Sequence, residues 1–473
     1  MNLLRRCLVP SALAVLALAL AGCINTPLPK LDRSMPAHWR NATGAPARPP
    51  VDLHAWWKAF HDPLLDRLVD RALHDNPDVA IAREHLRAAR ALYGDRMAPL
   101  RPQLNLHTAN PIDPDASASY FVIGFDSSWE LGLFGRGQAT DRIASGHYLD
   151  AVATLRAARV SLVAEVARDL VRLRTAQRQV RLLGHIVQAR RRQVALTRKR
   201  VQLRLSSEAE LTRARAALET ARAALAAPRM QVDAAAHQLA LLLGRSEPDP
   251  TWLTSASLPK LGPHGPIAAP AALLRSRPGI AQAEAQVVAT AGQLGIARAD
   301  MYPRIGLGAS MLWSANIATY KHNSGTNAIA TVGPLIQIPL FDWGMRVSHK
   351  VAQGHLLKAA VLNYRKAVLT GVAEVETALG NLQQQRRREQ ATEAACAAWK
   401  QASATQDTRR HLGLSSDLDG ADIRIARARA EIQLASARSD RDLAYIALYK
   451  ALGGAPPLPS RDDSVASARR STR

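Results

Sequence analysis

Side chains that could support catalysis occur in this chain of 473 residues, but they do not stand at catalytic spacings. Its 14 histidines are scattered, with no His-Glu-x-x-His helix and no Cys-x-x-Cys pair to hold a metal ion. The sequence also lacks a Gly-x-Ser-x-Gly elbow for a serine nucleophile and a Gly-x-x-x-x-Gly-Lys-Ser/Thr loop for nucleotide phosphates. His54 and His61 lie near Trp56 and Trp57 and are more typical of packing or surface residues than of ligands. We therefore expect no enzyme, no cofactor and no bound metal.

One cysteine follows a segment that predicts covalent modification. Leu8 to Leu20 is an apolar run after a short basic start, too short to anchor in a bilayer and typical of a signal peptide. The run ends in Leu20-Ala21-Gly22-Cys23, which is similar to the bacterial lipobox. We expect Cys23 to become the first mature residue and to carry acyl chains, each buried CH2 contributing roughly 0.8 kcal/mol of membrane affinity. The alternative is a plain secretory signal followed by an incidental cysteine.

Composition limits the remaining possibilities. After Cys23 no apolar run of about 20 residues recurs, so any membrane crossing must use strands. Cys7 leaves with the signal and Cys23 is lipidated, which leaves Cys396 without a disulfide partner in the chain. The net charge of +23 would suit a nucleic-acid partner, but the basic residues are spread along helical stretches and export removes that partner. We expect a solvated basic surface and no nucleic acid; attraction to anionic lipid headgroups is the weaker alternative.

The chain contains an internal duplication, which predicts two halves of the same architecture. Asn76-Pro77 matches Arg277-Pro278 at an offset of 201 residues, and Leu133-Phe134 matches Leu340-Phe341 at an offset of 207. Leu205-Ser206-Ser207 matches Leu414-Ser415-Ser416 at an offset of 209. Because the offset grows in only two places, we expect the halves to differ by short insertions.

Each half begins with a helix and two short strands. The helices are expected at about 64–98 and 271–300, each closed by a proline, Pro102 or Pro303. The strands are expected at 103–109, 119–131, 304–313 and 328–340. Their alternation is partial, as in strands with one lipid face and one wet face. Four strands cannot close a barrel alone.

Long helical hairpins follow the strands in both halves. Between 142 and 203, apolar residues recur every seven positions, which is coiled-coil spacing over about 90 Å of helix at 1.5 Å per residue. The return segment repeats this spacing from Leu211 to Leu239, and the second half repeats the outgoing pattern from Val361 to Leu382. Pro228 lies within the first return helix and is expected to kink it.

Together these features resemble the TolC-like outer membrane factor family, in particular its lipoprotein branch, often labelled NodT. The resemblance rests on the lipobox, the repeat starts, and the segments Trp129 to Arg136, Pro339 to Gly344 and Gly413 to Asp419. It implies a mainly α protein with a membrane β-barrel, in which three chains contribute four strands each to one twelve-stranded outer-membrane barrel. Long antiparallel coiled-coil helices would continue the barrel as a tunnel. Closing the sheet between protomers also removes edges that lipid would not tolerate.

The predicted layout has five parts. They are a signal peptide (1–22), a lipid-anchored segment at the equatorial belt (23–63), a first repeat (64–270) with strand hairpin 103–131 and helical hairpin 142–243, a second repeat (271–454) with strand hairpin 304–340 and helical hairpin 349–452, and a basic tail (455–473).

The resemblance also places candidate site residues at the hairpin tips. In the family, acidic rings narrow the periplasmic mouth just after the second tip, which implies a gate and cation filter at Asp419 and Asp422. Glu210 would join them from the first hairpin, whereas Arg213 departs from an acidic mouth and could pair with an acidic neighbour. The alternative is that Asp419 and Asp422 are solvated acids that suit a helix start.

By resemblance, the chain would be the outer-membrane channel of a tripartite efflux system, conducting drugs or other small toxic compounds passively. The implied partners are two further copies of the chain, a periplasmic adaptor, an inner-membrane pump and outer-membrane lipid. A lipid-anchored periplasmic coiled-coil adaptor or scaffold is the alternative, because it would share the long helices without needing a barrel.

Overall fold

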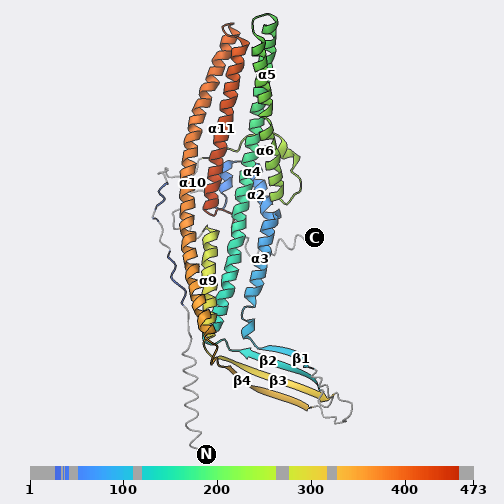
Figure 1. Cartoon of the computed structure of the whole chain (residues 1–473), viewed down its shortest axis with the longest axis vertical. Helices are drawn as coiled ribbons and strands as arrows, with labels where there is room; N and C mark the ends of the chain where they lie inside the picture. The colour runs from blue at the N-terminus through green and yellow to red at the C-terminus, as the bar shows by residue number, and fades with distance from the viewer. Residues whose placement is uncertain are drawn as a thin grey trace, which may run out of the picture. The chain divides into compact units, whose positions relative to one another are not determined.

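The computed structural model describes residues 27–32, 36, 38–41, 52–109, 120–262, 276–316 and 327–457. These residues fall into two compact units. The first, here called the sheet unit, contains 84–153 and 280–367; the second, the helical unit, contains 34–83, 154–279 and 368–473. Each unit therefore takes segments from both halves of the duplication. Figure 1 labels the elements.

The sheet unit contains one antiparallel sheet in the order β1-β2-β3-β4. Its strands are β1 (Gln103–Ala109), β2 (Tyr120–Glu130), β3 (Arg304–Asn316) and β4 (Asn327–Gln337). All four expected strands are confirmed, with ends that differ by a few residues. Phe125 pairs with Leu106 on one side and with Met311 on the other, so both halves contribute to one continuous sheet.

The two faces of this sheet differ sharply in polarity. Alternate residues of a strand share a face, and the register collects apolar side chains on one of them: Leu104, Leu106, Ile123, Phe125, Trp129, Ile305, Leu307, Met311, Trp313, Val332 and Ile336. The opposite face is mostly polar or glycine. On it, His107 Nδ1 lies 2.9 Å from Asp126 Oδ2, and the Ser310 and Thr331 hydroxyls are 2.6 Å apart. The alternation predicted as partial is therefore complete enough to separate an apolar face from a polar one.

Helices of the sheet unit pack closely beside the strand ends. A Cβ on Gly146 would lie 2.6 Å from Ala289 N, so only glycine permits this approach of α4 (Arg136–Gln202) to α9 (Pro278–Ala299). Arg136 at the start of α4 forms an ion pair of 3.0 Å with Glu130 at the end of β2. The helices and strands of this unit are thus joined by both packing and charge.

The first expected helix is wrong as a single element. It consists of α2 (Pro63–Asp75) and α3 (Pro77–Gly94), followed by a 3-10 turn, η2 (Ala98–Leu100). Asn76 between them is extended, because the proline ring that follows disfavours helical backbone at this position. Its side chain accepts a 3.0 Å hydrogen bond from Val79 N and donates to Leu242 O. Arg277 before Pro278 is likewise non-helical, so the break is repeated in the second half.

The outgoing helices of the two hairpins are equal in length. α4 and α10 (Met345–His411) each contain 67 residues, and both run through the two units. The return segment of the first hairpin is split into two helices, α5 (Glu208–Ala223) and α6 (Ala226–Leu242). The return segment of the second hairpin is one helix, α11 (Asp417–Ala451). The expected kink is confirmed as a break at Ala224 and Leu225. Pro228 explains it, because its ring clashes with the carbonyl four residues earlier, that of Ala224.

The backbone corrects one part of the predicted repeat register. Phe134 and Gly135 have φ of 55° and 83°, and Trp343 and Gly344 have φ of 54° and 80°. The turn before α4 is therefore equivalent to the turn before α10 at the offset of the helical hairpins. The match of Leu133-Phe134 with Leu340-Phe341 is shifted by two residues, because the extra residues of the second half lie between β4 and this turn.

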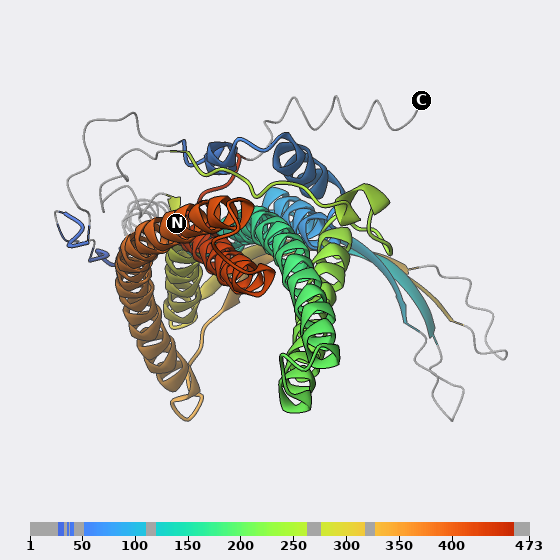
Figure 2. The same ribbon diagram turned by 90° about the horizontal axis from the view of Figure 1, so that it is seen from above.

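In the helical unit, four helices pack in the order α5-α4-α11-α10 (Figure 2). Val187 and Val194 of α4 are buried against Leu211 and Leu218 of α5, which confirms the predicted seven-residue pattern. Ile186 and Ala189, on another stripe of α4, pack against Ile425 and Ala428 of α11. The joint between α10 and α11 contains Cys396, Ala430 and Leu434. The two hairpins are thus joined through α4 and α11.

A short aromatic element packs against the return helix. Trp56 and Phe60 of η1 (Trp56–Phe60) are fully buried, and Trp56 stacks on Tyr449 of α11 at 5.6 Å between ring centroids. A further short helix is α7 (Pro250–Leu253). None of the helices in the described part of the chain is long and apolar enough to cross a membrane. The predicted signal peptide, the predicted lipidation site Cys23 and most of the predicted basic tail lie outside the described residues.

Candidate functional site

Both hairpin tips close with the same pattern of hydrogen bonds. In the first tip, Leu205 N donates to Arg200 O at 2.7 Å, and in the second, Leu414 N donates to Arg409 O at 2.8 Å. This closure needs a left-handed residue, for which glycine is the usual choice. Gly413 supplies it in the second tip with φ of 72°, whereas Arg204 adopts φ of 58° in the first. The chain therefore carries more backbone strain at the first tip.

The return helices begin with serine caps that engage two of the predicted gate residues. Ser416 caps α11, and its backbone and side chain donate to Asp419 Oδ2 at 3.1 and 2.7 Å. These hydrogen bonds, with Arg409 and Arg200 nearby, lower the pKa of Asp419. Its carboxylate closes a capping box and is exposed. Asp419 therefore caps the start of its own helix in this protomer.

Glu210 occupies the equivalent position in the first hairpin. The Ser206 hydroxyl donates to Glu210 Oε2, and this bond, with Arg200 and Arg213 nearby, lowers the pKa of Glu210. Ser207 caps α5 and receives the backbone N–H of Glu210 at 3.3 Å. Arg213 donates to the backbone oxygen of Ala209, and it forms no ion pair within the described residues. The charge of Arg213 nevertheless contributes to lowering the pKa of Glu210.

Asp422 differs from both, because it reaches the other hairpin. Its Oδ1 accepts a 2.7 Å hydrogen bond from Gln193 Nε2 of α4 and lies 3.8 Å from the Arg190 guanidinium. Sequence reasoning missed Gln193 and Arg190. The sequence did contain a sign of Gln193, because this polar residue follows Ile186 by one heptad and so belongs to the same stripe of α4. In the structure that stripe packs against α11 and Gln193 is buried. The structure therefore brings Asp422 to the joint between the hairpins and leaves Asp419 and Glu210 at their own helix starts.

Further polar contacts continue the joint between α4 and α11. Arg178 pairs with Glu431 at 3.1 Å, and Gln179 Nε2 donates to Ser436 Oγ at the same distance. Arg427 also binds Glu431, at 3.0 Å. The apolar contact of Ile186 with Ile425 lies between these polar contacts and the bond of Gln193 to Asp422. Movement of one hairpin against the other would have to break these contacts.

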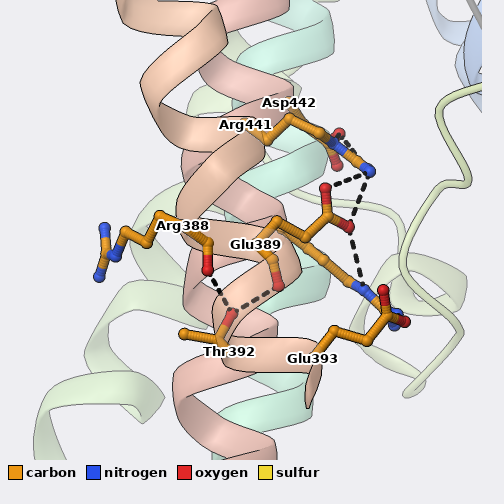
Figure 3. A network of polar contacts seen from close by, with 7 residues as sticks. Arg388, Glu389, Thr392, Glu393, Arg441 and Asp442 are labelled. Carbon is orange, nitrogen blue, oxygen red and sulfur yellow. Dashed lines mark hydrogen bonds and ion pairs between the residues drawn. The ribbon is translucent and has the colours of Figure 1, made fainter. Parts of the chain in front are cut away.

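A charged cluster joins α10 to α11 farther from the tips (Figure 3). Arg441 holds both Glu389 oxygens at 2.8 Å and Asp442 Oδ1 at 2.7 and 3.0 Å. Asp442 is 0% exposed, and its Oδ2 has no hydrogen-bond partner among the residues that the structure describes. Burial raises the pKa of Asp442 to about 7, although Arg441 opposes this shift. The second hairpin therefore contains a carboxyl group that titrates near neutral pH.

No group of three or more potential metal ligands occurs in the part of the chain that the structure describes. His54 Nδ1 lies 2.8 Å from Ala455 O, and His61 Nδ1 lies 3.1 Å from Lys58 O, so both bind backbone. The arrangement can position carboxylates and hold two hairpins together. Among the described residues we find no arrangement of a nucleophile with a general base.

Comparison with known proteins agrees with this geometry. The family model described as "Outer membrane efflux protein" matches residues 68–245 and 269–454. The "Solvent efflux pump outer membrane protein SrpC" of Pseudomonas putida is 28% identical over 413 residues, covering 84% of this chain and 86% of that protein. "Outer membrane protein OprJ" of Pseudomonas aeruginosa is 28% identical over 453 residues, covering 93% and 94%. The solved structure of the outer-membrane channel OprN has a TM-score of 0.78 and 27% identity, covering 91% of this chain and 99% of that one.

Proposed function

The chain belongs to the outer membrane efflux protein family, and on that premise we propose that three copies of it form one exit duct of a tripartite efflux system. The resemblance to TolC-like outer membrane factors is confirmed, and the chain is an outer-membrane component of efflux machinery.

The observation that carries the proposal is the sheet with one apolar face and two open edges. Within the described residues, β1 pairs only with β2 and β4 only with β3, so each outer strand leaves a row of backbone donors and acceptors unpaired. Lipid cannot satisfy these groups. Pairing β4 of one protomer with β1 of the next closes the sheet, and three copies supply twelve strands with the apolar face outward. β2, β3 and β4, with 11, 13 and 11 residues, are long enough to cross a bilayer.

The segment after β4 supports contact with lipid or a neighbouring protomer. Leu340 and Trp343 are each 90% exposed, and Phe341 between them is also largely exposed. Large apolar side chains in such a row mark an interaction surface. Cys23 would add acyl chains in the same membrane, which makes outer-membrane lipid a second partner.

The helical hairpins would form the periplasmic tunnel and its mouth. Asp419 and Glu210 have lowered pKa values and stay ionised at neutral pH. Asp422 follows Asp419 by three residues in α11. A three-fold axis would turn each into three carboxylates, which favour cations at a constriction. We therefore assign Asp419, Asp422 and Glu210 to a periplasmic gate and cation filter.

The partners and cargo follow from what such a duct requires. Conduction through it is passive, so an inner-membrane pump must supply energy and a periplasmic adaptor must connect pump and duct. The relative SrpC is named for solvent efflux, which favours small toxic compounds as cargo. No catalytic step is needed, and we propose that the chain is not an enzyme.

Purified full-length protein in detergent and in planar bilayers tests this proposal. We expect a heat-resistant trimer on gels and cation-selective channels. A monomer without conductance would instead favour the lipid-anchored scaffold, which shares the long helices but needs no closed sheet. Replacing Cys23 by serine should abolish lipid labelling and leave conductance intact; unchanged labelling would contradict the assignment of that site.

A further inference from the structure

We propose that a cationic cavity in the helical unit is a binding site for an organic anion with an apolar body. The cavity has a volume of about 430 Å³ and lies between α4, α10, α11 and the segment 257–261. This volume falls within the range of small-molecule sites. The proposal concerns a site separate from the hairpin tips and does not depend on the duct function.

The lining of this cavity has a surplus of positive charge. Six cationic residues line it: Arg178, Arg181, Lys260, Lys400, Arg438 and Arg441. Only two carboxylates, Glu389 and Glu431, line it as well. Both carboxylates are already held, Glu431 by Arg178 at 3.1 Å and Glu389 by Arg441 at 2.8 Å. Arg438 also pairs with Glu389 at 3.4 Å and with Glu393, outside the lining, at 2.7 Å. The positive charge that remains unpaired is that of the other cations.

Three of these cations are available to a ligand. Within the described residues Arg181, Lys260 and Lys400 form no ion pair, and all three are exposed. Each can only donate hydrogen bonds, so each favours an anionic oxygen such as that of a carboxylate or phosphate. They come from three different segments, α4, the segment 257–261 and α10, which allows them to converge on one group.

The remaining lining is apolar and would hold the body of the ligand. It includes Leu258, Leu261, Cys396, Leu434 and Ala435. Leu258 and Leu261 are partly exposed and present this apolar surface, whereas Cys396, at 1% exposed, is already covered by the protein. An inorganic anion would leave this surface uncovered, whereas an aromatic or aliphatic carboxylate covers it and places its charge at the rim.

The charge surplus is not shared by every cavity of this arginine-rich chain. Another cavity of the helical unit, of about 420 Å³, is lined by Asp169, Asp440 and Arg172 as its only charged residues. There the carboxylates outnumber the cations. A third cavity, lined by Arg192, Arg424 and Arg427 with Glu431, is also cationic. There Arg424 pairs with Asp407 and Arg427 with Glu431, so within the described residues only Arg192 of these three forms no ion pair. The cavity beside 257–261 differs in presenting three such cations to a ligand.

Equilibrium dialysis of the full-length protein in detergent against radiolabelled 1-naphthoate tests the site, with protein-free micelles as the blank. We expect saturable binding of about one naphthoate per chain, and at least tenfold weaker binding of the uncharged analogue 1-naphthamide. The double variant Arg181→Gln with Lys400→Gln should weaken naphthoate binding at least tenfold, since two charge-assisted hydrogen bonds are lost. Both side chains are exposed, so the fold should be unaffected.

A matched control separates a specific site from general attraction. Arg191→Gln with Lys199→Gln removes the same charge from exposed positions of α4 outside the cavity lining and should change affinity less than twofold. Equal loss in both double variants, equal binding of naphthamide, or no saturable binding would overturn the proposal. Dihexanoyl phosphatidate, used as a competitor, distinguishes the source: displacement of naphthoate by it at lower concentration than by unlabelled naphthoate identifies a phospholipid headgroup, and the reverse identifies a free carboxylate.

Discussion

The two helical hairpins of this chain have the same length and the same tip closure, but they differ in their return helices and in where their acids lie. α4 and α10 have the same number of residues, and both return segments begin after a serine cap. The first return segment is broken near Pro228, whereas α11 runs without interruption for 35 residues. Backbone geometry has therefore been kept through the duplication while side chains have diverged.

The difference shows how one repeat can acquire contacts that its twin lacks. Asp422 in the second hairpin binds Gln193 of the first, but in the described part of the chain the equivalent residue, Arg213, binds the backbone of its own helix and no side chain. Asp442 is buried beside Arg441, whereas its equivalent, Asp233, is exposed. α11 packs against both α10 and α4, so its acids meet two neighbours. The contacts of each acidic residue therefore depend on which helices pack beside its own helix, and not on its position within the repeat.

The largest expected effect comes from moving the proline break into the second hairpin. Ala437 occupies the position equivalent to Pro228 and is fully buried in continuous helix. Ala437→Pro should lower the free energy of unfolding by about 3 kcal/mol or more, because it removes a helical hydrogen bond and clashes with the preceding turn. Pro228→Ala should change it by less than about 1 kcal/mol. Denaturant midpoints of the full-length protein in detergent measure both, and similar losses in the two variants would contradict the role given to Pro228.

The buried Asp442 predicts a pH dependence that its exposed counterpart lacks. Its folded pKa of about 7 lies above the ordinary value, so the folded state keeps a proton that the unfolded state releases. Its contribution to stability is therefore complete at low pH and decreases as the pH rises from about 4 to 7. Asp442→Asn should reduce the stability difference between pH 5 and pH 8 by on the order of 2 kcal/mol. Asp233→Asn is the control, and an equal reduction in it would show that burial is not the cause.

The acids after the second tip should affect ion flow more than the first tip does. Asp419→Ala with Asp422→Ala removes six carboxylates from a trimeric mouth and the bond to Gln193, so conductance should rise about twofold or more and cation selectivity should fall. Arg213→Ala, at the position equivalent to Asp422, should raise cation selectivity slightly. Single-channel recordings in planar bilayers measure both quantities. Unchanged currents in the double variant would count against the gate and leave Asp419 with its capping role alone.

The smallest expected effects concern the left-handed residues of the tips. Gly413→Ala should destabilise the second tip by roughly 1 kcal/mol through backbone strain, since no atom lies within 4 Å of the added methyl group. Arg204→Gly should relieve the same strain in the first tip and stabilise it by up to about 1 kcal/mol. Hydrogen exchange of the tip amides reports each change locally. We expect the stability of the tip to decrease in Gly413→Ala and to increase in Arg204→Gly. A change in the same direction in both variants would refute the structural equivalence of the two tips.

Local chemistry and periodicity in the sequence were sufficient to predict the strands, the long helices and the duplicated order of elements. Strands and heptads repeat over many residues, so a single exception does not hide their pattern. Arg159 is such an exception, because it interrupts the seven-residue repeat between Val152 and Val166. The break at Asn76 was predictable in principle from the proline that follows it. Pro228 is visible in the sequence, and the helix break at Ala224 follows from the clash of the proline ring with the carbonyl four residues earlier.

Tertiary structure alone decided which acids are capped, paired or buried. Asp419 and Asp422 are three residues apart and appear alike in the sequence, yet one closes its own helix start and the other binds α4. Asp442 and the cations around Lys400 could not be distinguished from other charged residues of a basic chain, because their properties depend on helices distant in sequence. Periodicity determines which face of a helix is apolar, but the partner packed against that face determines the chemistry of the polar residues at its border.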